Sequence, residues 1–370
     1  MEKFKKIAVV SVFTVFIFGL SVLHILLPDK DFSAAERKPL AQLPQLSANG
    51  VLTGDYFAEA ETYLLEQFPL RSGFLDCKRI LDKNIFLMSS SGGYTSAEDH
   101  LTKLDKALDE RQITHAVKLL NLILSQHPEI HSAKYAIVPD KNYYLSRFTK
   151  QPTLDYDVLY QLVSELDAEE IDLRPLLTLD DYYRTDSHWK QERILPIAEA
   201  ICQAFGVPAA DRDGYSASSL EGFKGVYYEL TESPPEPDTL TYLTNDAIEG
   251  AQVLCFNKFM RWEKMPVYNE DNFGQENMDS YDVFLGGPQS LITIENPAAS
   301  TDRHLILFRD SYGSSLTPLL IDSYAKITMI DLRYMNWYYM RQQDIDYSNA
   351  DVLLLYSTTF LNSAMSAGMR

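Results

Sequence analysis

An uncharged and almost wholly apolar run extends from Ile7 to Leu27 and stops at Pro28. A run of this length spans a bilayer as a helix. Three lysines precede it within residues 1–6, and such a basic flank stays on the cytoplasmic side. We therefore expect a cytoplasmic N-terminus, a single-pass anchor over residues 7–27 in the cell membrane, and an extracytoplasmic main domain. A cleaved signal peptide is the alternative, although no small-residue cleavage site follows the run directly.

Residues 28–95 are predicted to form a tether followed by a helical segment. The first part, residues 29–50, is charged and then rich in proline, which favours extended chain. Apolar residues recur at helical spacing across Val51–Met88 and are interrupted at Pro69, which predicts two helices joined there. A serine- and glycine-rich loop is expected over Ser89–Thr95.

From residue 96 to 370 the pattern alternates between apolar runs and amphipathic stretches. Such alternation predicts an α/β domain with a mostly parallel sheet covered by helices. Strands are expected at Ala133–Val138, near Ile171, and at Leu305–Phe308, Ile327–Leu332 and Val352–Tyr356; helices are expected at Leu101–Gln126, Tyr156–Leu166 and Gln191–Phe205, the last closed by Gly206. Residues of about 211–300 are rich in Tyr, Gly, Pro, Asp and Asn, which predicts a β-rich insertion.

Composition excludes several functional classes. A net charge of −19 leaves no basic face for phosphates, so nucleic acid is not an expected partner. Cys77, Cys202 and Cys255 are far apart without CxxC spacing, so neither a zinc site nor a disulfide framework is indicated, although one bridged pair stays open. We expect no cofactor.

A candidate nucleophile lies at the end of the strand expected at Leu305–Phe308. The strand runs into Asp310 and Ser311, and small residues follow, where a chain can turn and begin a helix. A serine at such a tip has its hydroxyl beyond the sheet edge, as in acyl-transferring enzymes. From these residues alone, an ordinary turn is the favoured explanation of Asp-Ser.

A candidate base lies in a second loop. Asp186 and His188 are two residues apart, a spacing that lets the carboxylate hold one ring nitrogen while the other faces a serine. Asp186 as a helix cap, with His188 and Trp189 packed on the first turn, is the structural alternative. No third metal ligand stands at a recognisable spacing, so we expect no metal site.

Two cations follow predicted strands. Lys141 and Arg333 each lie just past a strand end, and parallel strands bring such ends to one edge of a sheet. We predict that both bind substrate, as cations suited to an anionic one, and solvated loop positions are the alternative.

Several stretches in a fixed order resemble the DHHW family of Gram-positive bacterial envelope proteins, which is similar to the SGNH-like domain of alginate O-acetyltransferases. They are Gly54–Phe57 with Glu66–Arg71, Val138–Lys141, Thr185–Trp189, Asp282–Gly287, and Arg309–Tyr312 followed by Ile330–Tyr334. The resemblance implies an SGNH-hydrolase-like three-layer fold. It also implies Ser311 as nucleophile, His188 as general base and Asp186 as the carboxylate that orients the base. Arg309 departs from the glycine common in related hydrolases, and a residue of this size restricts how a backbone N–H approaches an oxyanion.

The resemblance implies an O-acetyltransferase that acts on a cell-envelope polysaccharide through an acetyl-serine. Because acetyl-CoA is cytoplasmic and one helix offers no path for an acetyl group, a multi-span membrane acyltransferase is the expected partner. A carbohydrate esterase with the same triad and a non-catalytic glycan-binding or scaffold protein are the alternatives.

Overall fold

In the computed structural model the chain divides into two units, Met1–Gly92 and Gly93–Arg370. The structure describes residues 2–30, 32–33, 38–47, 50–51, 54–71, 73–74, 77–78, 81, 94–105, 107–146, 148, 153–228, 234–257, 261–275, 278–335, 337–365 and 368–369.

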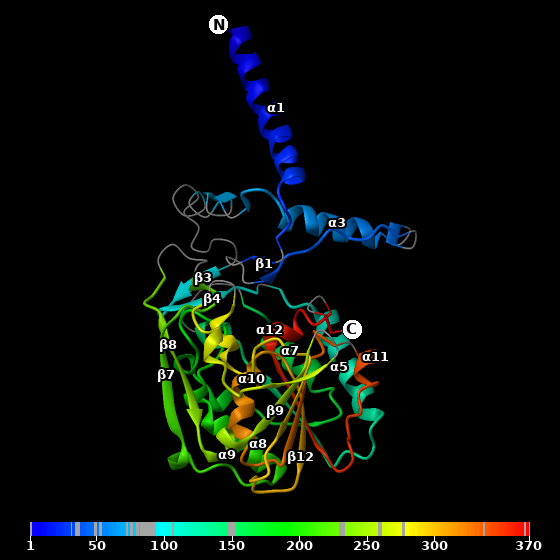
Figure 1. The fold of residues 1–370 in the computed structure, drawn as a ribbon, viewed down its shortest axis with the longest axis vertical. Helices are drawn as coiled ribbons and strands as arrows, with labels where there is room; N and C mark the ends of the chain where they lie inside the picture. The colour runs from blue at the N-terminus through cyan, green and yellow to red at the C-terminus, as the bar shows by residue number, and fades with distance from the viewer. Residues whose placement is uncertain are drawn as a thin grey trace. The chain divides into compact units, whose positions relative to one another are not determined.

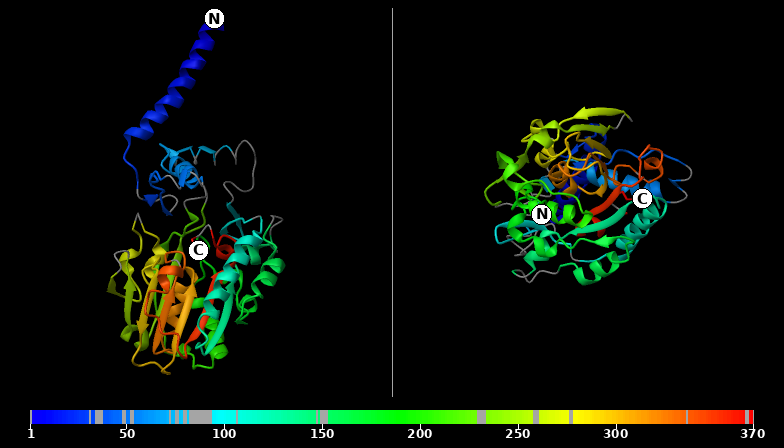
Figure 2. Two further views of the ribbon diagram at one scale, coloured as in Figure 1. Left: turned by 90° about the vertical axis from the view of Figure 1, so that its right-hand side faces the viewer. Right: turned by 90° about the horizontal axis from the view of Figure 1, so that it is seen from below.

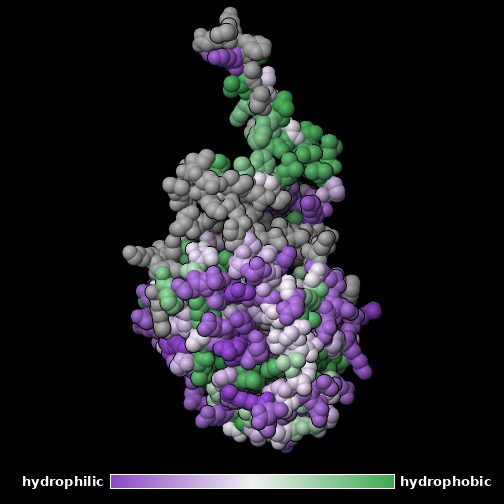
Figure 3. Space-filling model, turned by 90° about the vertical axis from the view of Figure 1, so that its left-hand side faces the viewer, coloured by the Kyte–Doolittle hydropathy of each residue, from purple (hydrophilic) through white to green (hydrophobic). Residues whose placement is uncertain are grey.

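The first unit begins with the long helix α1, Glu2–Leu26 (Figure 1). Its segment Lys5–Leu26 is long and apolar enough to cross a membrane, and it lies near the N-terminus, as a signal sequence does. In Figure 3 most of the described side chains along this helix are hydrophobic, and hydrophilic ones lie near the N-terminus. A short antiparallel pair, β1 (Phe32–Ser33) and β2 (Lys38–Pro39), and the helix α3 (Asp55–Glu66) follow. Most of the second helix expected within Val51–Met88, and most of the loop Ser89–Thr95, lie outside the described residues.

An eight-stranded sheet organises the second unit, in the order β10-β9-β11-β13-β12-β14-β5-β6. Its strands are β5 Ser132–Val138, β6 Glu169–Glu170, β9 Gln252–Phe256, β10 Trp262–Met265, β11 Leu291–Glu295, β12 His304–Arg309, β13 Lys326–Ile330 and β14 Asp351–Ser357. The five strands from β13 to β6 pair in parallel, whereas β11, β9 and β10 extend the sheet antiparallel. The domain is thus mixed α/β with a large, mostly parallel sheet, as the alternating pattern predicts.

Helices cover both faces of this sheet (Figure 2). Successive side chains of a strand point to opposite faces. Leu305 and Leu307 of β12 therefore join one hydrophobic cluster with the helix α8 (Leu195–Phe205), while Ile306 and Phe308 join another with α5 (Glu110–Ser125) and α7 (Tyr156–Val163). The shorter α-helices are α6 Lys141–Leu145, α9 Asp246–Gly250, α10 Tyr312–Leu316, α11 Trp337–Met340 and α12 Thr358–Leu361. The 3₁₀ turns are η1 Arg174–Leu176, η2 Leu179–Asp181, η3 Gln191–Arg193, η4 Arg212–Gly214, η6 Glu270–Asn272, η7 Ser280–Val283 and η8 Thr317–Leu320.

The helix predicted over Leu101–Gln126 is wrong at its start. Residues 94–103 form a hairpin of β3 (Tyr94–Ala97) and β4 (His100–Lys103), and α5 begins only after Asp109, whose side chain accepts from the Arg111 N–H. The two turn residues Glu98 and Asp99 both have positive φ, 47° and 59°, as a tight type I′ turn requires. Spaced leucines in this region imitate a helical face, which explains the error.

The other strands and helices predicted by range in the second unit are present with small shifts at their ends. Strands occupy the ranges expected at Ala133–Val138, Leu305–Phe308, Ile327–Leu332 and Val352–Tyr356, and the strand expected near Ile171 ends just before it. The helix expected over Gln191–Phe205 opens with the turn η3 and ends at Gly206, where φ is +69°. Within 211–300, β7 (Ser216–Phe223) and β8 (Asp238–Thr244) form a separate hairpin, while β9, β10 and β11 join the main sheet.

Candidate active site

Ser311 stands at the carboxyl end of β12, between two parallel neighbours. The residue before Ser311, Asp310, fixes the turn after β12 through both of its carboxylate oxygens. One accepts from the Tyr312 N–H at 3.0 Å, and the other accepts from the backbone N–H and the hydroxyl of Ser357 at 2.8 and 2.7 Å. Because Ser357 ends β14, the position of Ser311 depends on the neighbouring strand as well as on its own.

Asp186 and His188 lie on a loop that is closed by a bridge between Tyr182 and Trp189. Asp186 is fully buried, and one of its oxygens accepts from the His188 backbone N–H at 2.9 Å and from Nδ1 at 2.6 Å. Its other oxygen accepts from the Val226 N–H at 2.8 Å. Since Nδ1 faces a carboxylate, it carries the proton, and Nε2 is left as an acceptor.

The structure brings this loop to Ser311. The His188 Nε2 lies 2.7 Å from the Ser311 Oγ, across 123 positions of sequence. The serine hydroxyl therefore donates to the imidazole, and Asp186 supports the ring from behind. Such an arrangement can remove the hydroxyl proton as the oxygen attacks an acyl carbon.

The charges in this pair stabilise each other. Burial by itself raises the pKa of an aspartate, but the charge of His188 and hydrogen bonds from His188 and Val226 hold the pKa of Asp186 well below its usual range. Burial by itself lowers the pKa of an imidazole, yet the Asp186 carboxylate, with smaller contributions from Asp279 and Asp310, raises the pKa of His188 above its ordinary value. The loop is thus built to favour an imidazolium opposite Asp186.

Aromatic rings enclose the imidazole. The ring of Tyr281 stacks on His188 and that of Tyr312 lies 5.0 Å from it, centroid to centroid. The Tyr281 hydroxyl and the Trp189 indole N–H both donate to Ser315 Oγ, at 2.6 and 2.8 Å. Sequence reasoning missed Tyr281 and Ser315. The only signal was the position of Tyr281 directly before the stretch Asp282–Gly287 that carries part of the family resemblance.

A second network fixes the backbone beside Asp186. Asp238 accepts from the Thr185 N–H at 2.8 Å and from its hydroxyl at 2.7 Å, and the hydroxyl of Thr185 accepts from the Gly225 N–H at 3.0 Å. A Cβ on Gly225 would lie 2.3 Å from the Cβ of Asp186. Only glycine therefore fits at this close approach.

Asp282 adds a titratable group that sequence reasoning also missed. Burial raises the pKa of Asp282 to about 7, and the charge of Asp279 adds to this effect. The positive charges of His188 and Arg309 act in the opposite direction. Its side chain packs closely on Gly287, where an added Cβ would lie 2.1 Å from an Asp282 oxygen.

The two cations predicted to bind substrate are both engaged with the protein. Lys141 is only 2% exposed, and its ammonium donates to the backbone carbonyls of Leu101, Tyr183 and Arg184. Burial lowers the pKa of Lys141 to about 7. All three ammonium hydrogens have acceptors, so Lys141 holds the loop that leads to Asp186, and its predicted contact with substrate has no support in this arrangement.

Arg333 lies past the end of β13 and is paired with Asp331. Its Nε and Nη2 donate to the two carboxylate oxygens, the shortest contacts being 2.9 and 2.6 Å. The side chain is 19% exposed, so part of the guanidinium faces outward. Substrate binding by Arg333 stays a prediction.

Arg309, two residues before Ser311, is 1% exposed. Its guanidinium donates to Ser314 Oγ at 3.1 Å and to the Gly287 and Gln289 carbonyls at 3.4 Å, and it lies 3.5 Å from Asp331. These contacts connect the turn after β12 to the segment of Gly287 and Gln289 and to Asp331.

Comparison with solved structures places this fold. A DHHW family protein from Eubacterium siraeum DSM 15702 is 22% identical over 75% of this chain and 95% of its own, with a TM-score of 0.61. The chain shares its fold with this DHHW family protein. The resemblance predicted from the sequence stretches is thus confirmed at the level of fold.

Two further structures are similar to this DHHW-like fold. PatB1 of Bacillus cereus, solved with a sulfonyl adduct, is 17% identical over 75% of this chain and 98% of its own, with a TM-score of 0.59. The O-acetyltransferase domain of Pseudomonas putida AlgJ is 13% identical over 73% of this chain and 92% of its own, with a TM-score of 0.43. No family model matches the sequence, and no curated protein matches it.

Proposed function

We propose that this protein is a membrane-anchored, extracytoplasmic O-acetyltransferase that acts on a cell-envelope polysaccharide. The observation that carries the proposal is the 2.7 Å contact between Ser311 Oγ and His188 Nε2, with Asp186 2.6 Å from Nδ1. A protein that had only kept the fold has no need of this alignment. The α/β architecture with helices on both faces of the sheet supports an SGNH-hydrolase-like three-layer fold as its framework.

The proposed reaction has two half-reactions. In the first, His188 takes the Ser311 proton while Oγ attacks the acyl carbon of the donor, and the leaving group departs with the proton from His188. In the second, a sugar hydroxyl gives its proton to His188 and attacks the acetyl-serine. Ser311 recovers its proton from His188 as the acetylated sugar leaves.

Location sets the remaining parts of the proposal. The helix α1 serves as the anchor, with its lysines in the cytoplasm and the second unit outside. A multi-span membrane acyltransferase then supplies the acetyl group. Arg333, partly exposed beyond β13, is proposed to contact the substrate.

The reactivity of Ser311 is tested directly. The full chain in lipid nanodiscs is incubated with p-nitrophenyl acetate or with a sulfonyl fluoride, the latter because PatB1 was solved with a sulfonyl adduct. Intact-mass and peptide spectrometry should find the acyl or sulfonyl group on Ser311. Ser311→Ala should remove it, whereas Ser348→Ala, at an exposed serine, should not.

The acceptor is identified by repeating the reaction with a soluble oligosaccharide. Acetylated sugar as the main product supports the transferase. Acetate alone, with or without the oligosaccharide, identifies an esterase instead. Equal acylation of the wild type and Ser311→Ala would remove the basis for either activity.

A further inference from the structure

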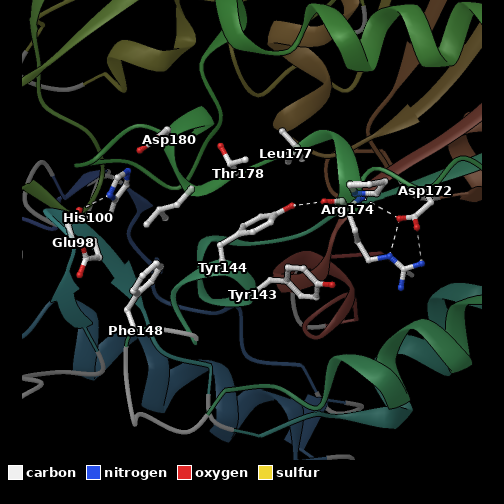
Figure 4. Close-up of a pocket in the computed structure, with 12 residues that line it drawn as sticks. Glu98, His100, Tyr143, Tyr144, Phe148, Asp172, Arg174, Leu177, Thr178 and Asp180 are labelled. Atoms are coloured by element: carbon white, nitrogen blue, oxygen red, sulfur yellow. Dashed lines mark hydrogen bonds and ion pairs between the residues drawn. The ribbon is translucent and has the colours of Figure 1, made fainter.

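A pocket of about 770 Å³ lies in the second unit and is separate from the Ser311 site in its lining (Figure 4). None of Ser311, His188 and Asp186 lines it. In Figure 4, Glu98 and His100 stand on one side and Asp172 with Arg174 on the other, and the rings of Tyr143 and Phe148 lie between them. The proposed chemistry leaves this pocket without a role.

The pocket and Ser311 belong to the same edge of the sheet. Tyr143 follows the carboxyl end of β5, and Arg174 follows that of β6, just as Ser311 follows β12. In the strand order β12-β14-β5, the strand before Ser311 and the strand before Tyr143 are two strand spacings apart, about 10 Å. In addition, Thr178 and Asp180 of the lining lead directly into the loop that carries Asp186 and His188. A polymer that passes Ser311 can therefore reach the pocket along one edge.

Aromatic rings give the pocket apolar faces. Phe148 is 61% exposed although it is a large hydrophobic residue. The ring of Tyr143 is fixed by edge-on contacts to Tyr144 and Tyr156, each with centroids 5.1 Å apart. Rigid aromatic faces combined with a few polar groups are typical of small-molecule sites, and the C–H face of a sugar ring packs well on them.

His100 offers a buried acceptor. Its Nδ1 lies 2.8 Å from the Glu98 carbonyl oxygen, so Nδ1 carries the proton. Burial lowers the pKa of His100, which keeps the ring neutral. The residue is 5% exposed, and its Nε2 has no hydrogen-bond partner among the described residues. A buried acceptor without a donor is costly, and because Nε2 is itself buried, a hydroxyl of a bound molecule satisfies it only after the ring turns towards the pocket.

The charge of the lining selects against anions. Glu98, Asp172 and Asp180 contribute carboxylates. The Arg174 guanidinium is already paired with Asp172 through contacts of 2.7 and 2.9 Å, and it lies over the ring of Tyr160. A ligand rich in hydroxyls and without negative charge fits this combination of groups.

We propose that this pocket binds an uncharged sugar unit of the polysaccharide, a few units from the hydroxyl that is acylated at Ser311. The inference rests on the proposed function for the identity of the polymer. The pocket, its aromatic faces and the unpaired His100 nitrogen are features of the structure whether or not Ser311 is reactive.

Equilibrium binding to the full chain in nanodiscs tests the inference, without an acyl donor. The probes are cellohexaose and N-acetylchitohexaose, which are uncharged, and hexamannuronate, which is anionic. At least one uncharged hexamer should bind at least about tenfold more tightly than the anionic one. Phe148→Ala should weaken its binding at least about fivefold, and Asp180→Ala should weaken it as well. Both positions are exposed, so folding is preserved. Trp262→Ala, at an exposed aromatic on the opposite edge strand β10, should bind like the wild type.

Three results would overturn the inference: no binding of either uncharged hexamer, tighter binding of the anionic one, or unchanged binding by both pocket variants. Failure of the proposed function is seen separately. An unreactive Ser311 with binding that depends on Phe148 would contradict only the acyl transfer. A reactive Ser311 with binding that neither Phe148→Ala nor Asp180→Ala changes would contradict only the pocket.

Discussion

The ring of Tyr281 lies flat on the imidazole of His188, with centroids 3.8 Å apart and planes inclined by 7°. The hydroxyl of Tyr281 donates to Ser315 Oγ, so the tyrosine is held at both its ring and its tip. This stack restricts rotation of the imidazole and keeps Nε2 facing Ser311, which is how a supporting residue positions a reacting one.

Replacement of Tyr281 tests this positioning role. Tyr281→Leu should slow acylation of Ser311 by p-nitrophenyl acetate about tenfold, with little change in KM, because the imidazole loses its stacking partner. Tyr281→Phe keeps the ring and should stay within about threefold of the wild type. Stopped-flow release of nitrophenol measures both. Equal rates for the two variants would show that the stack has no part in positioning.

The carboxylate of Asp186 should control the basicity of His188. In Asp186→Asn the pKa of His188 falls because its negative partner is lost, and acylation should slow by about 10²- to 10⁴-fold. In the wild type the rate should rise with pH through a limb above 6.5, the ordinary histidine value. The pH–rate profile checks both statements. A limb at the same pH in both proteins would contradict the coupling.

The same pair should make stability depend on pH. The raised pKa of His188 gives a stabilisation that is complete below the unfolded value, about 6.5, and is lost as the pH rises through the folded value. The lowered pKa of Asp186 gives one that is present above about 4 and is lost as the pH falls. The difference in unfolding free energy between the wild type and His188→Gln should therefore be largest from about pH 4 to 6.5.

Urea unfolding followed by tryptophan fluorescence measures this difference, because all three tryptophans lie in the second unit. A difference in unfolding free energy that increases towards pH 9 would have the opposite sign to the one expected. It would mean that His188 is neutral in the folded protein.

Gly225 should be sensitive to the smallest side chain. In Gly225→Ala the new Cβ meets the Asp186 Cα and Cβ and the Thr185 carbonyl carbon at 2.3–2.5 Å, so backbone must move. We expect a loss of about 1–3 kcal/mol in unfolding free energy and a slower reaction at Ser311. Gly214→Ala is the matched control, since nothing lies within 4 Å of its Cβ. Wild-type stability and rate for Gly225→Ala would refute the close approach.

Arg309 is expected to stabilise the turn that carries the serine. Arg309→Met removes the donor to Ser314, Gly287 and Gln289, while Asp331 keeps its contact with Arg333. The unfolding free energy should fall by about 1–3 kcal/mol, and acylation should slow as the turn loosens. Arg212→Met, which breaks the surface pair with Glu199, should cost less than about 0.5 kcal/mol. A faster reaction in Arg309→Met would mean that the arginine obstructs the site.

Local patterns in the sequence carried much of the fold but little of the detail around the site. The runs at Leu305–Phe308 and Val352–Tyr356 are buried on both faces of a parallel sheet, and such strands read as continuous apolar stretches. The hairpin of β3 and β4 was missed because Leu101 within it and Leu104 and Leu108 after it follow a helical spacing. The positive φ of its two turn residues is not specified by a glycine or an asparagine in the sequence.

Contacts between distant residues explain what sequence reasoning missed around His188. The spacing of Asp186 and His188 within one loop was readable, and the structure places both beside Ser311. Asp238 and Tyr281, in contrast, lie on distant segments, and nothing in the sequence of those segments indicates that they contact the histidine loop. Lys141 was predicted to bind substrate because it follows a strand and so lies at the edge of the sheet where Ser311 was expected, yet here it donates to the carbonyls of neighbouring loops.

Because Asp310 is hydrogen-bonded to the end of β14, Ser311 reaches its reactive position only when β12 and β14 have paired correctly. Residues 304–309 and 351–357 must pair in one register before Ser357 can meet the Asp310 carboxylate. A slip of one residue would turn the strand over and move the turn away from the histidine loop. Covalent labelling of Ser311 by a sulfonyl fluoride is therefore expected only after these long-range strand pairs have formed. The rate at which labelling appears during refolding thus reports the formation of the sheet.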